Sequence, residues 1–360
     1  MKPIAITMGD PSGIGPEIIV KAFMQEPELT HNCFVVGDVE AMRRAVGFVT
    51  SGHEYAIKIE AIFEAEIDTQ PAYSLPEQLS IKVLQIGEQK EDGLTPFNFN
   101  IGKISAASGK AAADAVIWAT KAALRGQIAA MVTAPLHKEA LALAGVKFPG
   151  HTELLQAESA AFLGKSVQEV PVRMMLANEE LKTVLVSIHM SLRDAIEAVS
   201  YENVIETIRI TRDFLHRTVG AKSRRRIAVA GLNPHAGEGG LFGREEIEVI
   251  SPAIAAAQKE GIDVAGPFAP DTVFMRARDK NVNGIKQLGE FDAVIAMYHD
   301  QGLIPVKYLG VEQGVNVTLG LPLVRTSPDH GTAFDIAGQG IADPSSLIAA
   351  IKMARNLVKV

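Results

Sequence analysis

The chain has 360 residues, of which 47% are hydrophobic and 21% charged, a composition typical of a globular protein of about two domains. Its net charge of −7 argues against nucleic acid or an anionic membrane as the main partner. A single cysteine excludes an internal disulfide, no run reaches the roughly 18 apolar residues of a membrane helix, and nothing resembles a signal peptide. We therefore expect a cytoplasmic protein.

In chain order, strand-length apolar runs alternate with helix-like segments. The first strand is expected at residues 4–7, followed by a glycine-rich turn and a helix with Pro16 in its first turn. A second strand at residues 34–38 precedes a helix at 39–47. An alanine-rich helix at 106–126 then ends at Gly126, a residue suited to a helix C-terminus.

The rest of the chain continues this alternation and ends in a capped helix. Asp343 is the expected cap of that helix. Apolar runs predict further strands at residues 128–133, 172–177, 183–188, 226–232 and 292–298. This pattern predicts α/β layers around a largely parallel sheet. Residues 66–103 are the exception, since their polar composition indicates a hairpin or arm outside the central sheet.

The turn after the first strand, MGDPSGIGPE, invites comparison with a dinucleotide-binding fingerprint in which Asp38 would bind the ribose. The third glycine is missing, however, and Pro16 removes a backbone N–H that a pyrophosphate would need. A tight strand-to-helix turn that requires small residues is the better interpretation.

Four histidines follow strand-like runs: His137, His189, His235 and His299. Ligands in open α/β sheets bind beyond the carboxyl ends of the strands. Three imidazoles that converge there would form a catalytic divalent-metal site, which we predict for His189, His235 and His299. The alternative is that each is an ordinary hydrogen-bonded loop residue, because spacing cannot show convergence.

A second polar group follows the histidines. Lys307, Asn316 and Arg325 lie close to predicted strands and would together form a clamp for an anion. They indicate a phosphorylated or carboxylated small substrate, although Lys307 by itself could equally be a surface charge.

The chain contains several long motifs: ITMGDPSGIGPE, GHTELL, GLNPHAGEGGLFGREE, GPFAPDT, YHDQGLIPVK and GVNVTLGLPLVRTSPDHGTAFDIAG. Together they resemble one known family, the 4-hydroxythreonine-4-phosphate dehydrogenase (PdxA) family of pyridoxal phosphate synthesis. The resemblance implies a two-domain α/β/α sandwich of the isocitrate/isopropylmalate dehydrogenase-like type, with the active-site cleft between the domains. We expect residues 1–125 with 305–360 to form the first domain, and residues 126–304, which carry the metal-ligand histidines, to form the second.

The resemblance also implies roles for particular residues. His189, His235 and His299 become ligands of Zn, Mg or Co, contributed across the interface of a homodimer, and His137 is left with a structural or minor role. Further substrate contacts come from His151 and Thr152 of GHTELL, beside Lys307, Asn316 and Arg325. The HGTAFDIAGQG segment resembles an NAD-binding loop, which makes His330, Gly331, Thr332 and Asp335 cofactor contacts. Asp300 is either the base or a residue that orients its neighbour.

The family reaction is the NAD- or NADP-dependent oxidation of 4-phosphooxy-L-threonine, followed by decarboxylation to 3-amino-2-oxopropyl phosphate. Related dehydrogenases act on phospho-D-threonate, phospho-D-erythronate or a cyclic dihydrodiol dicarboxylate. The sequence contains no recognisable signal for binding the amino group that distinguishes the biosynthetic substrate. A silent binding protein on the same scaffold would be expected to lack a metal-ligand histidine, and all three are present.

Overall fold

The structure is a computed structural model that describes residues 2–50, 57–67, 79–87, 89–90, 93–94, 99–218, 225–282, 284–310 and 313–358. The chain divides into two compact units, one formed by Met1–Pro171 with Leu321–Val358 and the other by Val172–Gly320. These boundaries differ from the predicted ones. Residues 126–171 belong to the first unit because β7 (Ala130–Thr133) pairs with β1 (Ile4–Thr7). Residues 305–320 belong to the second because β15 (Val315–Leu319) pairs with β8 (Arg173–Ala177).

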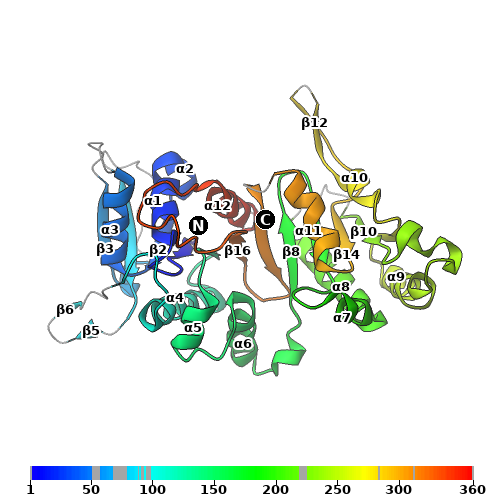
Figure 1. Cartoon of the computed structure of the whole chain (residues 1–360), viewed down its shortest axis with the longest axis horizontal. Helices are drawn as coiled ribbons and strands as arrows, with labels where there is room; N and C mark the ends of the chain where they lie inside the picture. The colour runs from blue at the N-terminus through cyan, green and yellow to red at the C-terminus, as the bar shows by residue number, and fades with distance from the viewer. Residues whose placement is uncertain are drawn as a thin grey trace. The chain divides into compact units, whose positions relative to one another are not determined.

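The first unit contains a parallel sheet in the order β16-β7-β1-β2-β4-β3. One layer of helices is formed by α1, α3 and α12, and another by α4, α5 and α6 (Figure 1). The remaining strands are β16 (Arg325–Pro328), β2 (Cys33–Gly37), β4 (Ser80–Gln85) and β3 (Lys58–Ile62). The helices are α1 (Gly15–Gln25), α2 (Pro27–Thr30), α3 (Val39–Thr50), η1 (Glu64–Glu66), α4 (Ala106–Leu124), α5 (Lys138–Leu143), α6 (His151–Leu163), η2 (Val167–Glu169) and α12 (Ser345–Val358).

The predicted arm at residues 66–103 is wrong for its central part. Strand β4 lies inside the sheet, paired in parallel with β2 on one side and β3 on the other, because the alternate residues Ile81 and Val83 are fully buried. A two-strand hairpin, β5 (Gln89–Lys90) and β6 (Gly93–Leu94), follows as a separate small sheet. Residues 68–78, 88, 91–92 and 95–98 of this stretch lie outside the described part of the chain.

Local signals in the sequence place the first unit's helices. Ser105 caps α4 by accepting a 3.1 Å hydrogen bond from the Ser108 amide, and Gly126 follows that helix with φ of +69°. Asp38 accepts a 2.8 Å bond from the Ala41 amide at the start of α3. It is therefore a helix cap, which supports rejecting the ribose-binding interpretation. Cys33 is buried, as expected of a structural thiol.

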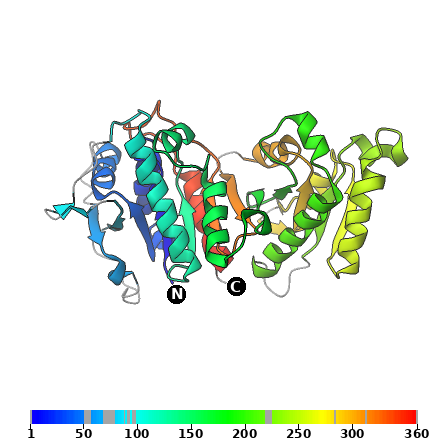
Figure 2. The same ribbon diagram turned by 90° about the horizontal axis from the view of Figure 1, so that it is seen from below.

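The second unit contains a mixed sheet in the order β11-β10-β14-β9-β8-β15, in which β8 is antiparallel to both its neighbours. Its core includes Leu176, Leu185, Val294 and Leu303. Figure 2 shows the same chain from below. The further strands are β11 (Val264–Phe268), β10 (Ile227–Ala230), β14 (Ala293–Ala296), β9 (Lys182–Leu185), β12 (Lys280–Val282) and β13 (Ile285–Gln287). The helices are α7 (Leu192–Glu197), α8 (Tyr201–Thr218), η3 (Pro234–Gly240), η4 (Glu246–Ile250), α9 (Ser251–Lys259), α10 (Val273–Ala277) and α11 (His299–Tyr308).

Within the described ranges, no helix combines the length and the apolar character that spanning a bilayer requires.

Candidate functional site

The three predicted metal ligands follow three neighbouring strands of the second unit. His235 follows β10, His299 follows β14 and His189 follows β9, and these strands are adjacent and parallel. The carboxyl ends of parallel strands meet at one edge of a sheet, which is where ligands bind in open α/β sheets. The topology therefore brings all three residues to the same edge.

Two of these histidines lie side by side. The ring centroids of His189 and His299 are 5.6 Å apart. Two imidazoles on one tetrahedral ion place their centroids about 5 Å apart, given metal–nitrogen bonds of about 2 Å. The Nδ1 atom of His299 is 2.7 Å from Oδ1 of Asp300, a contact of the kind that commonly orients metal-binding imidazoles. The pair thus suits a divalent cation.

His235 lies on a strained loop of its own. Residues 235–239 all have positive φ, with His235 at +53°, a conformation that persists only when its surroundings enforce it. Just before these residues, the buried carboxylate of Glu246 accepts bonds from the amides of Leu232 and Asn233, at 2.8 and 2.7 Å.

A glutamine connects this loop to the turn that carries His299. Gln301 donates from Nε2 to the Gly231 carbonyl at 2.8 Å, and its Oε1 accepts from the Met297 amide at 2.7 Å.

Among the described residues, no three His, Cys, Asp or Glu side chains are arranged to hold a metal ion. The structure of one chain therefore brings His189 and His299 together but does not complete the predicted trio with His235.

In the first unit, Arg325, a predicted substrate contact, is buried. Arg325 donates from Nε and Nη2 to the Thr133 hydroxyl, at 3.0 and 2.7 Å. Burial lowers the pKa of its guanidinium to about 9, and burial with the nearby Arg325 charge holds the pKa of His151 well below its usual range. His151 and Thr152 open α6, so the positive end of that helix dipole adds to the field.

The other two predicted substrate contacts belong to the second unit. Lys307 lies in the last turn of α11, and Asn316 lies on β15 opposite Leu176 of β8. Both residues are half-buried. They come from different elements of that unit.

The predicted cofactor segment follows β16 and lies against the glycine turn. Strands β16, β7 and β1 are adjacent and parallel, so the loops after them share one edge. The Ile14 amide donates to the Thr332 carbonyl at 3.0 Å. A Cβ on Gly13 would lie 2.8 Å from that carbonyl oxygen, which explains the small residue there. His137 stacks its ring 5.1 Å from Phe334, which supports a structural role for this histidine.

One acidic residue at this edge was missed by the sequence analysis. Asp10 follows β1 and is fully buried, and burial raises the pKa of its carboxyl to about 6 despite a 2.9 Å bond from the Ser12 amide to Oδ1. Its Oδ2 atom has no hydrogen-bond partner within the described residues. The same rule that selected the histidines, a polar residue directly after a strand, would have found it.

The Asp10→Asn variant is expected to be more stable than the parent protein at neutral pH. The raised pKa means that the folded state resists ionisation, so stability is lost as pH rises from 3.8 to about 6. Asparagine removes that cost, roughly 2–3 kcal/mol by the size of the shift. Urea unfolding at pH 7.5 and at pH 4 should show the gain only at the higher pH. Asp271→Asn, at an exposed position, is the control; an equal gain at both pH values would contradict the explanation.

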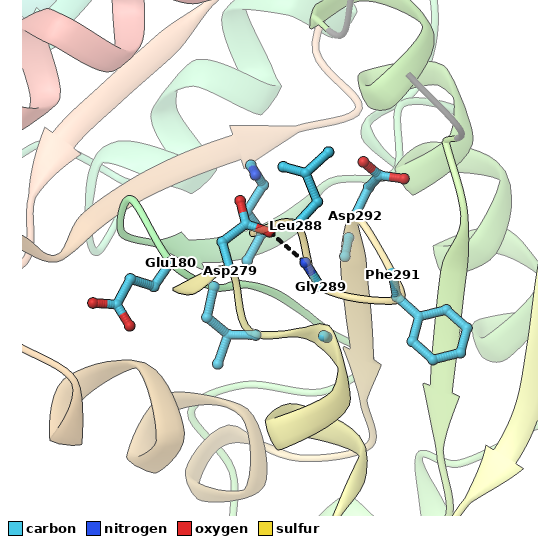
Figure 3. A pocket seen from close by; sticks show the side chains of 10 residues that line it. Glu180, Asp279, Leu288, Gly289, Phe291 and Asp292 are labelled. Atoms are coloured by element: carbon cyan, nitrogen blue, oxygen red, sulfur yellow. Dashed lines mark hydrogen bonds between the residues drawn. The ribbon is translucent and has the colours of Figure 1, made fainter. Parts of the chain in front are cut away.

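A cavity of about 290 Å³ in the second unit lies at the edge of the sheet opposite to His189 and His299. It is lined by residues that precede or begin β9 and β14, including Lys182, Phe291 and Asp292, so it sits at the amino ends of the strands whose carboxyl ends lead to His189 and His299. Figure 3 shows Asp279 at its wall, accepting a 2.8 Å bond from the Gly289 amide. We assign it no part in the reaction.

Comparison with known proteins places the chain in a family. A family model described as pyridoxal phosphate biosynthetic protein PdxA matches residues 29–354. The chain is 50% identical over 355 residues to a 4-hydroxythreonine-4-phosphate dehydrogenase of Beijerinckia indica subsp. indica, covering 99% of this chain and 95% of that protein. It is 43% identical over 356 residues to a D-threonate 4-phosphate dehydrogenase of Salmonella typhimurium, covering 99% of each.

A solved structure agrees with these matches. The crystal structure of a 4-hydroxythreonine-4-phosphate dehydrogenase from Klebsiella pneumoniae is 40% identical, with a TM-score of 0.81, covering 100% of this chain and 98% of that one. Fold and sequence together define the chain as an α/β dehydrogenase. It belongs to the PdxA family, as the motifs predicted.

Proposed function

We propose that the protein oxidises 4-phosphooxy-L-threonine with NAD to the 3-oxo acid, which loses carbon dioxide to give 3-amino-2-oxopropyl phosphate, in pyridoxal phosphate synthesis. The observation that carries this proposal is the 50% identity, over 99% of the chain, to a relative named for that substrate. The geometry within each unit is consistent with it, because the first unit offers the buried guanidinium of Arg325 and the second offers a pair of imidazoles at strand ends.

The substrate phosphate is assigned to the basic groups. Arg325 presents a rigid, planar fork that suits phosphate oxygens, and the start of α6 at His151 and Thr152 offers backbone donors and a favourable dipole. Lys307 and Asn316 are assigned further polar contacts with the substrate. Contacts that hold the reacting carbon of a substrate in place can supply about 7–11 kcal/mol.

The imidazoles are assigned to a divalent ion, Zn, Mg or Co. When bound, such an ion supplies a Lewis acid that lowers the pKa of the substrate hydroxyl and polarises the ketone formed from it. His189 and His299 are its ligands from one chain, and Asp300 keeps the His299 ring oriented or takes the hydroxyl proton. His235 is the third ligand. A homodimer in which this residue comes from the second subunit would complete the set.

NAD or NADP is assigned to the loop after β16. His330, Gly331, Thr332 and Asp335 lie in this loop at the carboxyl edge of the first unit's sheet, the edge where open α/β sheets bind ligands. The loop has the backbone of a turn rather than of a strand or helix.

D-threonate 4-phosphate is the second candidate substrate. The relative of that name in Salmonella typhimurium is 43% identical over 99% of both chains. The two candidates share the phosphate, the neighbouring alcohol and the carboxylate, and they differ in whether an amino or a hydroxyl group lies next to the carboxylate. The residues of the clamp serve both.

Formation of NADH by the purified protein tests the proposal. The protein should reduce NAD with 4-phosphooxy-L-threonine at a higher kcat/KM than with D-threonate 4-phosphate or D-erythronate 4-phosphate. A chelator should abolish turnover, and a divalent metal should restore it. The opposite preference would favour the second candidate, and no turnover with any phosphorylated acid would refute both.

A further inference from the structure

We propose that Glu17 is the positioning residue of the cofactor loop, defined as residues 330–342, so that NAD affinity depends on this buried carboxylate. The inference rests on the proposed function, which assigns NAD to that loop. Glu17 belongs to the first turn of α1 and is 1% exposed. It touches the loop and is not itself assigned a contact with NAD.

Both carboxylate oxygens of Glu17 bind the backbone of the loop. Oε1 accepts from the Gly338 amide at 2.5 Å, and Oε2 accepts from the Gly340 amide at 2.7 Å. Both glycines have positive φ, +83° and +66°. A Cβ on Gly340 would lie 2.3 Å from the Phe48 carbonyl oxygen, so the backbone there approaches its neighbours more closely than a side chain allows.

Helix α1 holds the loop at two further points. The Ile14 amide, directly before the helix, donates to the Thr332 carbonyl at 3.0 Å, and Nζ of Lys21 donates to the Ala342 carbonyl at 2.7 Å. The side chains of Glu17 and Lys21 are one turn apart on the same face of α1, and the Ile14 amide lies at the start of that helix. This end of α1 therefore binds the loop near its start, at its glycines and at its end.

This arrangement fixes the loop before the cofactor arrives. Binding costs free energy for every segment that it must order, so a loop that is already held binds more tightly than a free one. The central anchor accepts two bonds, one at each carboxylate oxygen of Glu17, and this carboxylate lies at the positive end of the α1 dipole.

Glutamine is the informative substitution because it is nearly isosteric. An ionised carboxylate only accepts hydrogen bonds, whereas an amide has one accepting oxygen and one donating nitrogen. In Glu17→Gln the amide nitrogen would face a glycine N–H, so one buried donor loses its partner. We expect the Kd for NAD, measured by calorimetry without substrate, to rise about tenfold, which corresponds to about 1.4 kcal/mol.

The kinetics should separate positioning from general damage to the fold. KM for NAD should rise by a similar factor in Glu17→Gln, while kcat at saturating NAD changes by less than about twofold. Glu17→Asp keeps the charge but is one methylene shorter, so its KM for NAD should lie between the values for the parent protein and for Glu17→Gln. Glu28→Gln, the same change at an exposed position on α2, should match the parent protein.

Two outcomes would overturn this inference and leave the proposed function standing: an unchanged NAD Kd in Glu17→Gln, or a fall in kcat alone. Should that variant fail to fold, hydrogen exchange of the parent protein decides instead. The Gly338 and Gly340 amides should be protected without NAD, and fast exchange of both would refute the anchor. If the parent protein bound no NAD, the proposed function itself would fail.

Discussion

Replacing His299 by alanine is expected to lower kcat by more than about a hundredfold and to abolish tight binding of a divalent metal. The ring of His299 lies 5.6 Å from that of His189, so its removal leaves one imidazole where the proposed site has two. Loss of a partner outside the ligand set typically costs 10–100-fold in metal affinity or activity, and loss of a ligand should cost more. Metal content after dialysis and NADH formation are the two measurements.

Two further variants make this result specific. His216→Ala removes a histidine from the end of α8, where the ring Nδ1 lies 3.1 Å from Nη1 of Arg225, and should leave metal content and kcat unchanged.

Asp300→Asn tests the carboxylate next to His299. If Asp300 orients His299, kcat should fall about 10–100-fold with its pH dependence retained. If Asp300 takes the proton, the acidic limb of the kcat profile should disappear. Full metal content in His299→Ala would remove this residue from the site.

Strand and helix positions followed from the sequence wherever one local signal was enough. The apolar runs at residues 4–7, 128–133 and 292–298 contain the strands β1, β7 and β14, as predicted. Asp343 accepts a 2.9 Å bond from the Ser345 amide at the start of α12, the position predicted for the cap. Strand β4 was misassigned because polar residues surround it. Its place in the sheet depends on pairing with β2 and β3, and such pairing between distant segments leaves no mark within the strand.

The predicted boundaries of the two units differ from the observed ones for a similar reason. Residues 126–171 alternate apolar runs with helix-like segments just as residues 172–304 do, and only the pairing of Met131 with Ala5 reveals that β7 belongs with β1. Sequence spacing placed His189, His235 and His299 at strand ends, and the order of β10, β14 and β9 then brings those ends together. The distance between two rings, and the strained loop that sets His235 apart, required coordinates.

Replacing Arg325 by methionine is expected to lower kcat/KM for the phosphorylated substrate by at least about a hundredfold while leaving the fold intact. Truncating a buried, hydrogen-bonded charge that binds an oppositely charged partner costs about 2–5 kcal/mol of binding. Most of the loss should appear in KM, because the phosphate is bound equally before and during hydride transfer.

The stability of this variant should change in the opposite direction to its activity. Burial lowers the pKa of Arg325 to about 9, so the folded protein holds this proton less tightly than the unfolded chain does, and the charge costs stability at neutral pH. The cost declines as pH rises above about 9. Methionine avoids it, so urea unfolding at pH 7 should show no loss of stability, and a gain that shrinks in alkaline solution. Arg125→Met, at an exposed position after α4, should alter neither kcat/KM nor stability. An unchanged KM for the phosphorylated acid in Arg325→Met would show that the phosphate binds elsewhere.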